Sequence, residues 1–558
     1  RSMDTTVGAE YWSRRGWAQH VDFRARPSEN SYIDMRFFGV LDRGDPNTGQ
    51  GQGGQDVTLD AGLDLKHGFR AVSSIEYLNR YVFRLAFSES FTQAVNSEVK
   101  SNAFIYNDWK GFSLGLLASR YQNFQSTNTG DEIKLIHVPS LELSSIERRL
   151  LNSRVMYSFD TAAEGVSRRE PDFVTGNLLG RFDFHPKVAL PLLLGGWSVR
   201  PEIGFWDTYY TQSIAPVPGQ VGTPIDQSLN RRALESSIEV RPPALARVFG
   251  KTIFGRQLKH VIEPRFGYRY VTGVQDFHDV ILFDQRDILA NTSEAEVGLI
   301  QRLYAKRKLP KQDVPCEVEA PSSKLEHKEP VGPLPGTTAV PLKCEDQGMT
   351  TREILSWELK AKYFADTNFG GALINGRRNV FYTTADYAGI AFLTDPRRWA
   401  PIVSKLRVST SANTDVQWEL DYDTKMGRIN SSTAIVNYRI GEVFIGGSQA
   451  FLHAPGEVIT STNLPAPDKF NQFRVILGYG HPNKRGISAG TTLGFDSNFH
   501  FLQYGAAQTS YNWDCCGVSV EYRRFALGAV RNENQFRFAF SLANVGTFGN
   551  LRRQERLF

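Results

Sequence analysis

The chain has 558 residues, of which 41% are hydrophobic, and it carries a formal net charge of +5 at pH 7. This charge is small for the length and is spread along the chain, so composition gives no support to nucleic-acid binding. No apolar run approaches the ~18 residues that a membrane-spanning helix needs. The 37 Phe, 21 Tyr and 48 Gly residues instead favour strands joined by tight turns.

Hydrophobic and polar residues alternate with a period of two between Thr5 and Val545. In residues 57–65 the odd positions are Val, Leu and Ala, and the even positions are Thr, Asp and Gly. Residues 415–423 and 536–543 alternate in the same way. Roughly 25 such segments of about 10 residues follow one another, separated by turn residues. Since neighbouring side chains on a strand point to opposite faces, each segment has one apolar face and one face that needs water.

This alternation predicts an all-β fold for residues 1–558. Closed barrels of single bacterial chains have even strand numbers, so we expect a single large transmembrane antiparallel β-barrel of about 26 strands. Short turns such as 27–30 alternate with longer loops such as 43–56, as in outer-membrane barrels. The pattern is irregular over 367–402, where we expect a strand that the alternation does not mark. Tandem β-sandwiches or a propeller would alternate too, but the sequence lacks the propeller repeat of about 40–50 residues.

A segment without strand character interrupts the pattern at 309–350. It contains seven prolines, no aromatic residue, and two of the four cysteines, Cys316 and Cys344. We expect a long irregular loop inserted in the barrel, not a separate domain. A disulfide between these two cysteines would contribute ~3–4 kcal/mol by closing the loop. Two free thiols are the alternative.

The sequence lacks two common catalytic motifs. It contains no His-Glu-x-x-His and no Cys-x-x-Cys, and its ten histidines lack metal-ligand spacing. We therefore predict no enzyme activity, no cofactor and no metal site. One face of segment 415–423 carries an acidic row, which we interpret as part of a water-filled lumen wall. The row consists of Asp415, Glu419, Asp421 and Asp423. A divalent-ion site or a pair of acid and base carboxylates is the alternative.

Two cysteines, Cys515 and Cys516, stand side by side at the start of an alternating segment near the end of the chain. Because they point to opposite faces of a strand, they suit two separate partners better than one core. The pair in its strand context resembles the signature of the LptD family of lipopolysaccharide-assembly proteins, also called OstA or Imp. Further stretches similar to that family are residues 260–270, 283–284, 296–299, 302–303, 420–427 and 524–533.

The resemblance covers essentially the whole chain and implies a translocon, integral to the outer membrane, that inserts lipopolysaccharide (LPS) into the outer leaflet. It implies release through a lateral seam between the first and last strands, at Thr5–Ser13 and Gln535–Asn544. The implied partners are an LptE-like plug lipoprotein, LptA/LptC-like periplasmic bridge proteins, LPS and membrane lipids. The outward residues at this seam would be Val7, Ala9, Tyr11, Phe536, Phe538 and Phe540.

The chain departs from the family pattern at its N-terminus. Family members carry a periplasmic domain ahead of the barrel, where the bridge docks, yet alternation begins here by Thr5. We therefore expect that domain to be absent. Family members can also weaken the seam with prolines in the first strands, but residues 5–13 contain none.

The cysteines are the second departure. In the family the adjacent pair bonds to two cysteines of the periplasmic domain, so we expect Cys515 and Cys516 to lack their native partners. Counted from a periplasmic start, the loop with the other two cysteines follows about the fifteenth strand and faces outside. The resemblance together with this count therefore favours a Cys316–Cys344 bridge.

Two other outer-membrane classes fit the alternation. A plugged nutrient receptor of about 22 strands would carry an N-terminal plug, and we see no such segment before the first predicted strand. A diffusion porin needs only about 16–18 strands, fewer than this chain can supply. A wider barrel without an internal plug would leak, so a separate plugging partner is required, which agrees with the plug lipoprotein that the resemblance implies.

Overall fold

The computed structural model describes residues 3–549 except 45–48, 89–90, 177, 216–221, 253–254, 309–348, 368–396, 412, 454–468, 481–484, 514, 529 and 543–545. The described chain is all-β, with one sheet of 29 strands and a separate two-stranded hairpin. None of its helices is long and apolar enough to cross a membrane.

Twenty-four strands of the described chain have nine or more residues and are called long strands here. In chain order they are β1 (Met3–Trp12), β2 (Gly16–Ser28), β3 (Ser31–Asp42), β4 (Gly54–Asp64), β5 (Arg70–Leu78), β6 (Glu98–Trp109), β7 (Phe112–Phe124), β8 (Glu132–Ser145), β10 (Met156–Glu170), β12 (Leu179–Ala189), β14 (Trp197–Tyr210), β17 (Leu229–Arg241), β19 (Gln257–Thr272), β20 (Thr292–Lys308), β21 (Met349–Phe364), β22 (Ile402–Ser411), β23 (Thr414–Asp423), β24 (Arg428–Ile440), β25 (Val443–His453), β26 (Lys469–Tyr479), β27 (Gly486–Asp496), β28 (Phe501–Asn512), β29 (Cys516–Leu527) and β30 (Arg531–Leu542).

The remaining elements are short. Five strands pair with long strands beside the turns: β9 (Arg148–Arg149), β11 (Phe173–Val174), β13 (Leu192–Leu194), β18 (Leu245–Val248) and β31 (Gly546–Gly549). Strands β15 (Ser213–Ala215) and β16 (Thr223–Ile225) pair with each other. Two α-helices, α1 (Tyr81–Phe87) and α2 (Phe91–Ala94), follow β5, and two 3-10 turns are η1 (Lys66–Gly68) and η2 (Phe277–Asp279).

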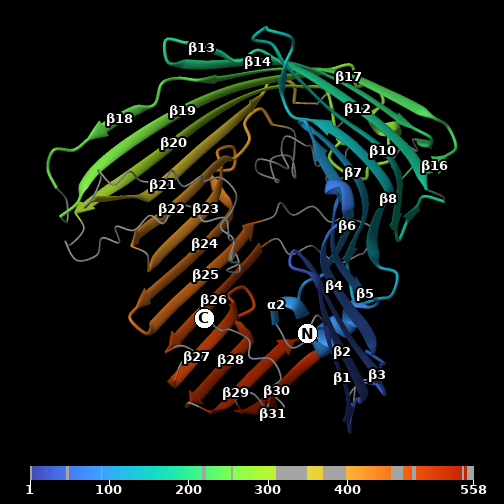
Figure 1. Ribbon diagram of the computed structural model, residues 1–558, viewed down its shortest axis with the longest axis vertical. Helices are drawn as coiled ribbons and strands as arrows, with labels where there is room; N and C mark the ends of the chain where they lie inside the picture. The colour runs from blue at the N-terminus through green and yellow to red at the C-terminus, as the bar shows by residue number, and fades with distance from the viewer. Residues whose placement is uncertain are drawn as a thin grey trace.

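Every long strand pairs antiparallel with the long strands before and after it in the chain. The strands follow one another round a ring, and α2 lies inside its outline (Figure 1). The prediction of an all-β fold built on one very large antiparallel sheet is confirmed. The strand expected within 367–402 falls mostly on residues 368–396, outside the described chain.

The outer face of the ring is apolar. On β26, alternate residues Phe473, Val475, Leu477 and Tyr479 are 39–48% exposed. Buried side chains lie on the inner face, where two segments leave the ladder and pack against the wall. Helix α1 covers β2, β3 and β5 to β7, and the connection 273–291 between β19 and β20 covers β10 to β17. Three hydrophobic clusters therefore lie between the wall and these inner segments, and another lies on β28 and β29.

The strands run between two opposite rims of the ring. We call them the Met3 end, where β1 begins, and the Arg15 end, where β1 turns into β2. Each long strand runs antiparallel to the one before it. The first, third and every further odd long strand, counted in chain order and not by its label, therefore starts at the Met3 end. β29 is the twenty-third long strand, so the turn with Cys515 and Cys516 lies at the Met3 end.

The position predicted for segment 309–350 relative to this turn is wrong by one strand. β20 is the fourteenth long strand, so Lys308 and its ladder partner Met349 lie at the Met3 end, as Cys515 does. The sequence count was therefore one strand too high at this point. Residues 309–348 themselves lie outside the described chain.

Candidate functional site

The six residues predicted to line a seam lie on the outer faces of the first and last long strands. All six are exposed: Val7, Ala9, Tyr11, Phe536, Phe538 and Phe540. Val7 is 73% and Phe536 is 74% exposed, values that an apolar side chain in water would not favour. The structure therefore gives both terminal strands an apolar outer face. Their role as a seam stays a prediction.

The backbone edges of these two strands share no ladder in the described chain. β1 pairs with β2 alone, over its whole length. β30 pairs with β29, and over Ala539–Leu542 also with β31, which folds back along its free edge. The described pairings include none between β1 and either β30 or β31. The junction between the two ends of the sheet is therefore built differently from the strand junctions beside it.

The acidic row on β23 is matched by bases on the neighbouring strand. Asp415 and Glu419 form ion pairs with Arg407 and Lys405 of β22, at 3.0 and 3.1 Å. Asp421 accepts a hydrogen bond from Ser431 Oγ at 2.8 Å. A divalent cation would have to compete with these bases, so the geometry disfavours a cation site along this part of the row.

Asp423 ends the row and is buried, at 2% exposure. Its Oδ2 accepts hydrogen bonds from Arg397 at 2.7 Å and from Asn430 Nδ2 at 3.0 Å. Its Oδ1 accepts the backbone N–H groups of Lys425 and Met426. Asp423 therefore fixes the turn between β23 and β24, and its oxygens are already in use.

Cys515 and Cys516 are both free in the structure, with Cys515 exposed at the turn before β29. Their sulfur atoms lie 2.7 Å apart, so the expectation that the two side chains point to opposite faces of a strand is wrong. The reason is that β29 begins at Cys516 and Cys515 lies in the turn before it. Cys316 and Cys344 fall on residues 309–348, outside the described chain. The predicted Cys316–Cys344 bridge and the lack of native partners for the adjacent pair therefore stay predictions.

Sequence reasoning did not find the most strongly organised polar cluster, which fastens the inner connection 273–291 to the wall. Apolar residues of this connection, among them Val280, Ile281 and Phe283, pack against Leu179 and Tyr210 of the wall. The side chains of Ile281 and Phe283 are 1% and 5% exposed. Burial on this scale orders the connection and brings its charged residues against the inner face of the sheet.

Arg181 of β12 is the centre of the cluster. Its side chain is fully buried, and its guanidinium contacts both carboxylate oxygens of Asp287 at 2.8 and 2.9 Å. It also forms ion pairs with Asp284 and with Glu164 of β10. Tyr210 of β14 donates its hydroxyl to Asp287 at 2.7 Å. One guanidinium thus joins two wall strands to two carboxylates of the inner connection.

Asp287 also shapes the connection itself. Its Oδ2 accepts the backbone N–H groups of Phe283 at 2.7 Å and Asp284 at 3.0 Å. Its backbone carbonyl accepts a hydrogen bond from Arg231 of β17 at 2.7 Å. The same carboxylate therefore closes a turn within the connection and binds Arg181 of the wall. The conformation of the connection and its attachment to the wall thus depend on one side chain.

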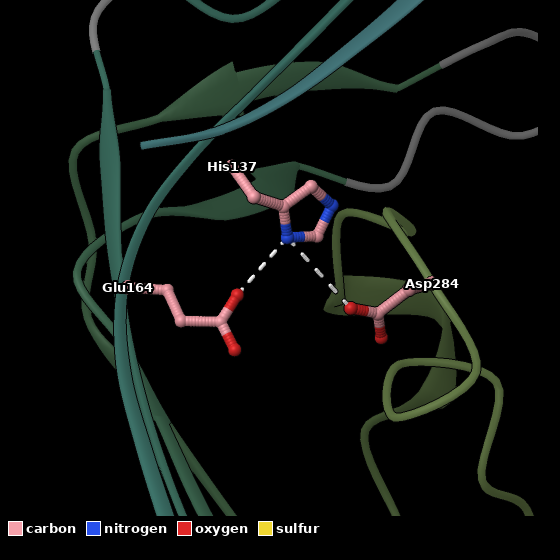
Figure 2. A group of neighbouring side chains, drawn as sticks. All are labelled: His137, Glu164 and Asp284. Carbon is pink, nitrogen blue, oxygen red and sulfur yellow. Dashed lines mark hydrogen bonds and ion pairs between the residues drawn. The ribbon is translucent and has the colours of Figure 1, made fainter. Parts of the chain in front are cut away.

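Three side chains of this cluster have the composition of a metal site (Figure 2). His137 Nδ1 of β8 lies 3.0 Å from Glu164 Oε2 and 3.9 Å from Asp284 Oδ2. However, Arg181 contacts both carboxylates and Arg286 contacts Glu164. Two guanidiniums beside the donors repel a cation and occupy the carboxylate oxygens. We conclude that the group is an ion-paired clamp and not a metal centre.

Charge balance sets the protonation of Asp284 in the connection. Burial alone would raise the pKa of its carboxyl, but the charge of Arg181 and the hydrogen bond from it outweigh burial and hold the pKa below its ordinary value. The carboxyl is therefore ionised at neutral pH and contributes to the clamp in its charged form.

The sequence signal for this cluster was weak. Phe283 and Asp284 belong to a stretch noted for its family resemblance, but no spacing marks Arg181, Glu164 or Asp287 as partners. Glu164 lies 17 residues and Asp287 lies 106 residues from Arg181 in the chain, and the three meet only because the connection folds inward. The sequence pattern does not distinguish a charged side chain that forms a buried ion pair from one that faces water in the lumen.

The fold as a whole has a distant match among solved structures. A mutant of the ferric enterobactin receptor PfeA from Pseudomonas aeruginosa aligns over 98% of this chain and 80% of its own, with 10% identity and a TM-score of 0.33. This likeness is too weak to bear on the function of the chain.

Sequence comparison is more specific. Residues 49–298 match the family model LptD, described as LPS transport system D. Two curated relatives, both LPS-assembly proteins LptD from Xylella fastidiosa, strains Temecula1 and 9a5c, are 24% and 23% identical over 301 residues. The alignments cover 51% of this chain and 36% of each relative, so about a third of their length is represented. Over these residues the chain is similar to the LptD family.

Proposed function

We propose that this chain forms the barrel of an outer-membrane LPS translocon and releases LPS through a lateral seam between β1 and β30. The family match over residues 49–298 carries the proposal. It is supported by the exposed apolar outer face, which suits lipid, and by inner ion pairs such as Arg407–Asp415, which suit a hydrated interior.

The junction of β1 and β30 supports the position of the seam. Parting a full ladder in lipid would leave unpaired backbone groups that cost several kcal/mol each. Two strand edges that share no full ladder can therefore part at a lower cost than the junctions beside them. The polar sugar and phosphate groups of LPS would stay in the hydrated interior. Its acyl chains would pass between the exposed side chains of Val7, Tyr11 and Phe538 into the membrane.

The proposal includes the partners that the resemblance implies. An LptE-like lipoprotein would fill the part of the lumen that α1 and the connection 273–291 leave uncovered. LptA/LptC-like bridge proteins would deliver LPS from the periplasmic side, which we assign to the Met3 end. The chain itself would move LPS without catalysing a reaction, since neither the sequence nor the clamp around Arg181 offers a nucleophile with an adjacent base.

A covalent lock across the seam tests this function. Ala9→Cys and Phe538→Cys would be introduced together in a chain whose native cysteines are serines, and joined in cells by a short bis-maleimide. We expect newly made LPS to stop reaching the cell surface in proportion to the cross-linked fraction. Surface arrival would be followed by pulse labelling and antibody access.

The two single-cysteine chains treated with the same reagent are the controls, because they carry the modification without the lock. Normal LPS arrival at complete cross-linking would reject release through this seam. Loss of arrival in a single-cysteine control would show that modification alone blocks transport, and the lock would then be repeated at Tyr11 and Phe536.

A further inference from the structure

Helix α1 is anchored to the N-terminal part of the wall. Its Arg84 is fully buried and forms ion pairs with Asp56 of β4 and Glu76 of β5. Phe87, at the end of the helix, stacks on Trp12 of β1 with ring centroids 5.8 Å apart. The end of α1 therefore lies on the inner side of the first strand.

The connection between β3 and β4 is anchored at the same place. Gln52 is 6% exposed, and its side-chain oxygen accepts a hydrogen bond from Arg15 at 2.6 Å. Its backbone N–H donates to Asp42 Oδ2 at 2.7 Å, and Arg15 also forms an ion pair with Asp42. Arg15 lies over the ring of Phe87 at 4.7 Å, which ties this connection to α1.

Both anchored segments reach across to the last hairpin. Arg531, the first residue of β30, donates from its guanidinium to the backbone carbonyl of Ser88 at 2.6 Å. Gln52 Nε2 donates to the carbonyl of Val530 at 3.5 Å. Arg531 is 6% exposed and lies over the buried ring of Phe525 at 3.7 Å. It also pairs with Glu533 at 2.6 Å, so its guanidinium is held in place from the β30 side.

We propose that Gln52, Ser88, Val530 and Arg531 form an inner clasp that holds the first and last strands together at the Arg15 end. This inference rests on the proposed function, because a clasp matters only if the seam opens. Arg531 and Gln52 are then positioning residues for LPS release. They set the resting separation of β1 and β30 without touching the outer faces between which the acyl chains pass.

The chemistry of the clasp suits reversible opening. A ladder between strands is cooperative, whereas the clasp has two cross-seam hydrogen bonds to backbone carbonyls, one of them from a charged donor. Charge-assisted hydrogen bonds are stronger than neutral ones, so Arg531 should dominate. Both acceptors are main-chain atoms, so the donors Arg531 and Gln52 are the positions where substitution can remove the contact.

The test measures the separation of the strands directly. Spin labels at Ala9→Cys and Phe538→Cys, in the serine background and in lipid nanodiscs, report a distance distribution by pulsed electron paramagnetic resonance. We expect Arg531→Gln to increase the population with the longer distance roughly 10- to 100-fold, the range that loss of one charge-assisted hydrogen bond allows. Gln52→Ala should act in the same direction with a smaller change, and Arg531→Lys should restore part of the short distance.

Arg524→Gln is the matched control, since Arg524 is exposed on the outer face of β29. An unchanged distance distribution in properly folded Arg531→Gln and Gln52→Ala proteins would overturn the clasp. The same would follow if Arg524→Gln widened the distribution as much as Arg531→Gln does.

A cell assay separates this inference from the proposed function. Arg531→Gln should make cells more permeable to a large antibiotic such as vancomycin, and cross-linking residues 9 and 538 should abolish the added permeability. Added permeability that persists in cross-linked cells would place the defect in the lumen and overturn the clasp. Normal LPS delivery through a locked seam would reject the proposed function even if Arg531→Gln still changed the distance.

Discussion

At the scale of single residues, buried charge decides how the inner connection is held. Arg181, whose side chain is fully buried, faces Asp287, Asp284 and Glu164. Removing one partner of a buried ion pair leaves the others uncompensated, and that loss is larger than the net contribution of the intact pair. Arg181 is therefore the residue on which attachment of the connection depends most.

We expect Arg181→Met to lower the free energy of unfolding by about 3–5 kcal/mol, because three carboxylates lose their shared counter-charge. Urea unfolding in lipid, followed by tryptophan fluorescence, gives the change, and limited proteolysis within 273–291 shows whether the connection is released. Arg232→Met is the control. Arg232 lies exposed on the outer face of β17, 3.5 Å from Asp207, and its loss should cost less than about 1 kcal/mol. Equal effects of the two substitutions would contradict the clamp.

The lowered pKa of Asp284 predicts that acid weakens the attachment of the inner connection to the wall. Its folded pKa lies below the unfolded value of about 3.9. Its stabilising contribution is therefore complete above that value and is lost as the pH falls through the folded pKa. We expect the connection to stay attached from pH 8 to pH 5 and to loosen below about pH 4.

A nitroxide at Gln275→Cys, in the serine background, would report this loosening as increased mobility. In Asp284→Asn the mobility should be higher at neutral pH and should depend less on acid. The charged or titratable groups near Asp284 include Arg181, Arg286, His137, Glu164 and Asp183. Loosening of the unsubstituted protein between pH 7 and pH 5 would show that another of these groups controls attachment.

At the scale of elements, each long strand separates two environments. On β29, Val520 is 51% exposed on the outer face, while the next residue, Glu521, is fully buried on the inner face beside Arg523. The ladder with β30 fixes this orientation, since Val520 pairs with Phe538 and Glu521 with Arg537. A shift of one residue would exchange the two faces along the whole strand.

A charge placed on either face of β29 tests this orientation. We expect Val520→Arg to destabilise the folded barrel by about 2–4 kcal/mol if the outer face meets the middle of the bilayer. Ser519→Arg, one residue earlier and on the inner face near Glu521, should cost clearly less. Urea titrations in lipid vesicles provide both values. A smaller cost for Val520→Arg than for Ser519→Arg would reverse the assignment of the two faces.

For the molecule as a whole, the sequence predicted the strands, which follow from the period of the hydrophobic pattern. It did not predict the contacts between segments that are far apart in the chain. Alternation of the kind seen at 415–423 predicted the strands and their two faces, because each strand carries its own pattern. The packing of the inner connection 273–291 and the clasp at Arg531 could not be predicted. The sequence of a loop has no pattern that identifies the strands against which the loop packs. The strand count was one too high at β20, because alternation alone does not fix where one strand ends and the next begins.

The clasp also bears on the order in which the molecule is built. Each pairing in the ladder joins two long strands that are adjacent in the sequence, so a hairpin can form from its own residues alone. The hydrogen bond from Arg531 to Ser88 instead spans 443 residues of sequence. This contact can therefore form only once β30 is in place. A chain that stops short of residue 531 lacks the donor of this hydrogen bond.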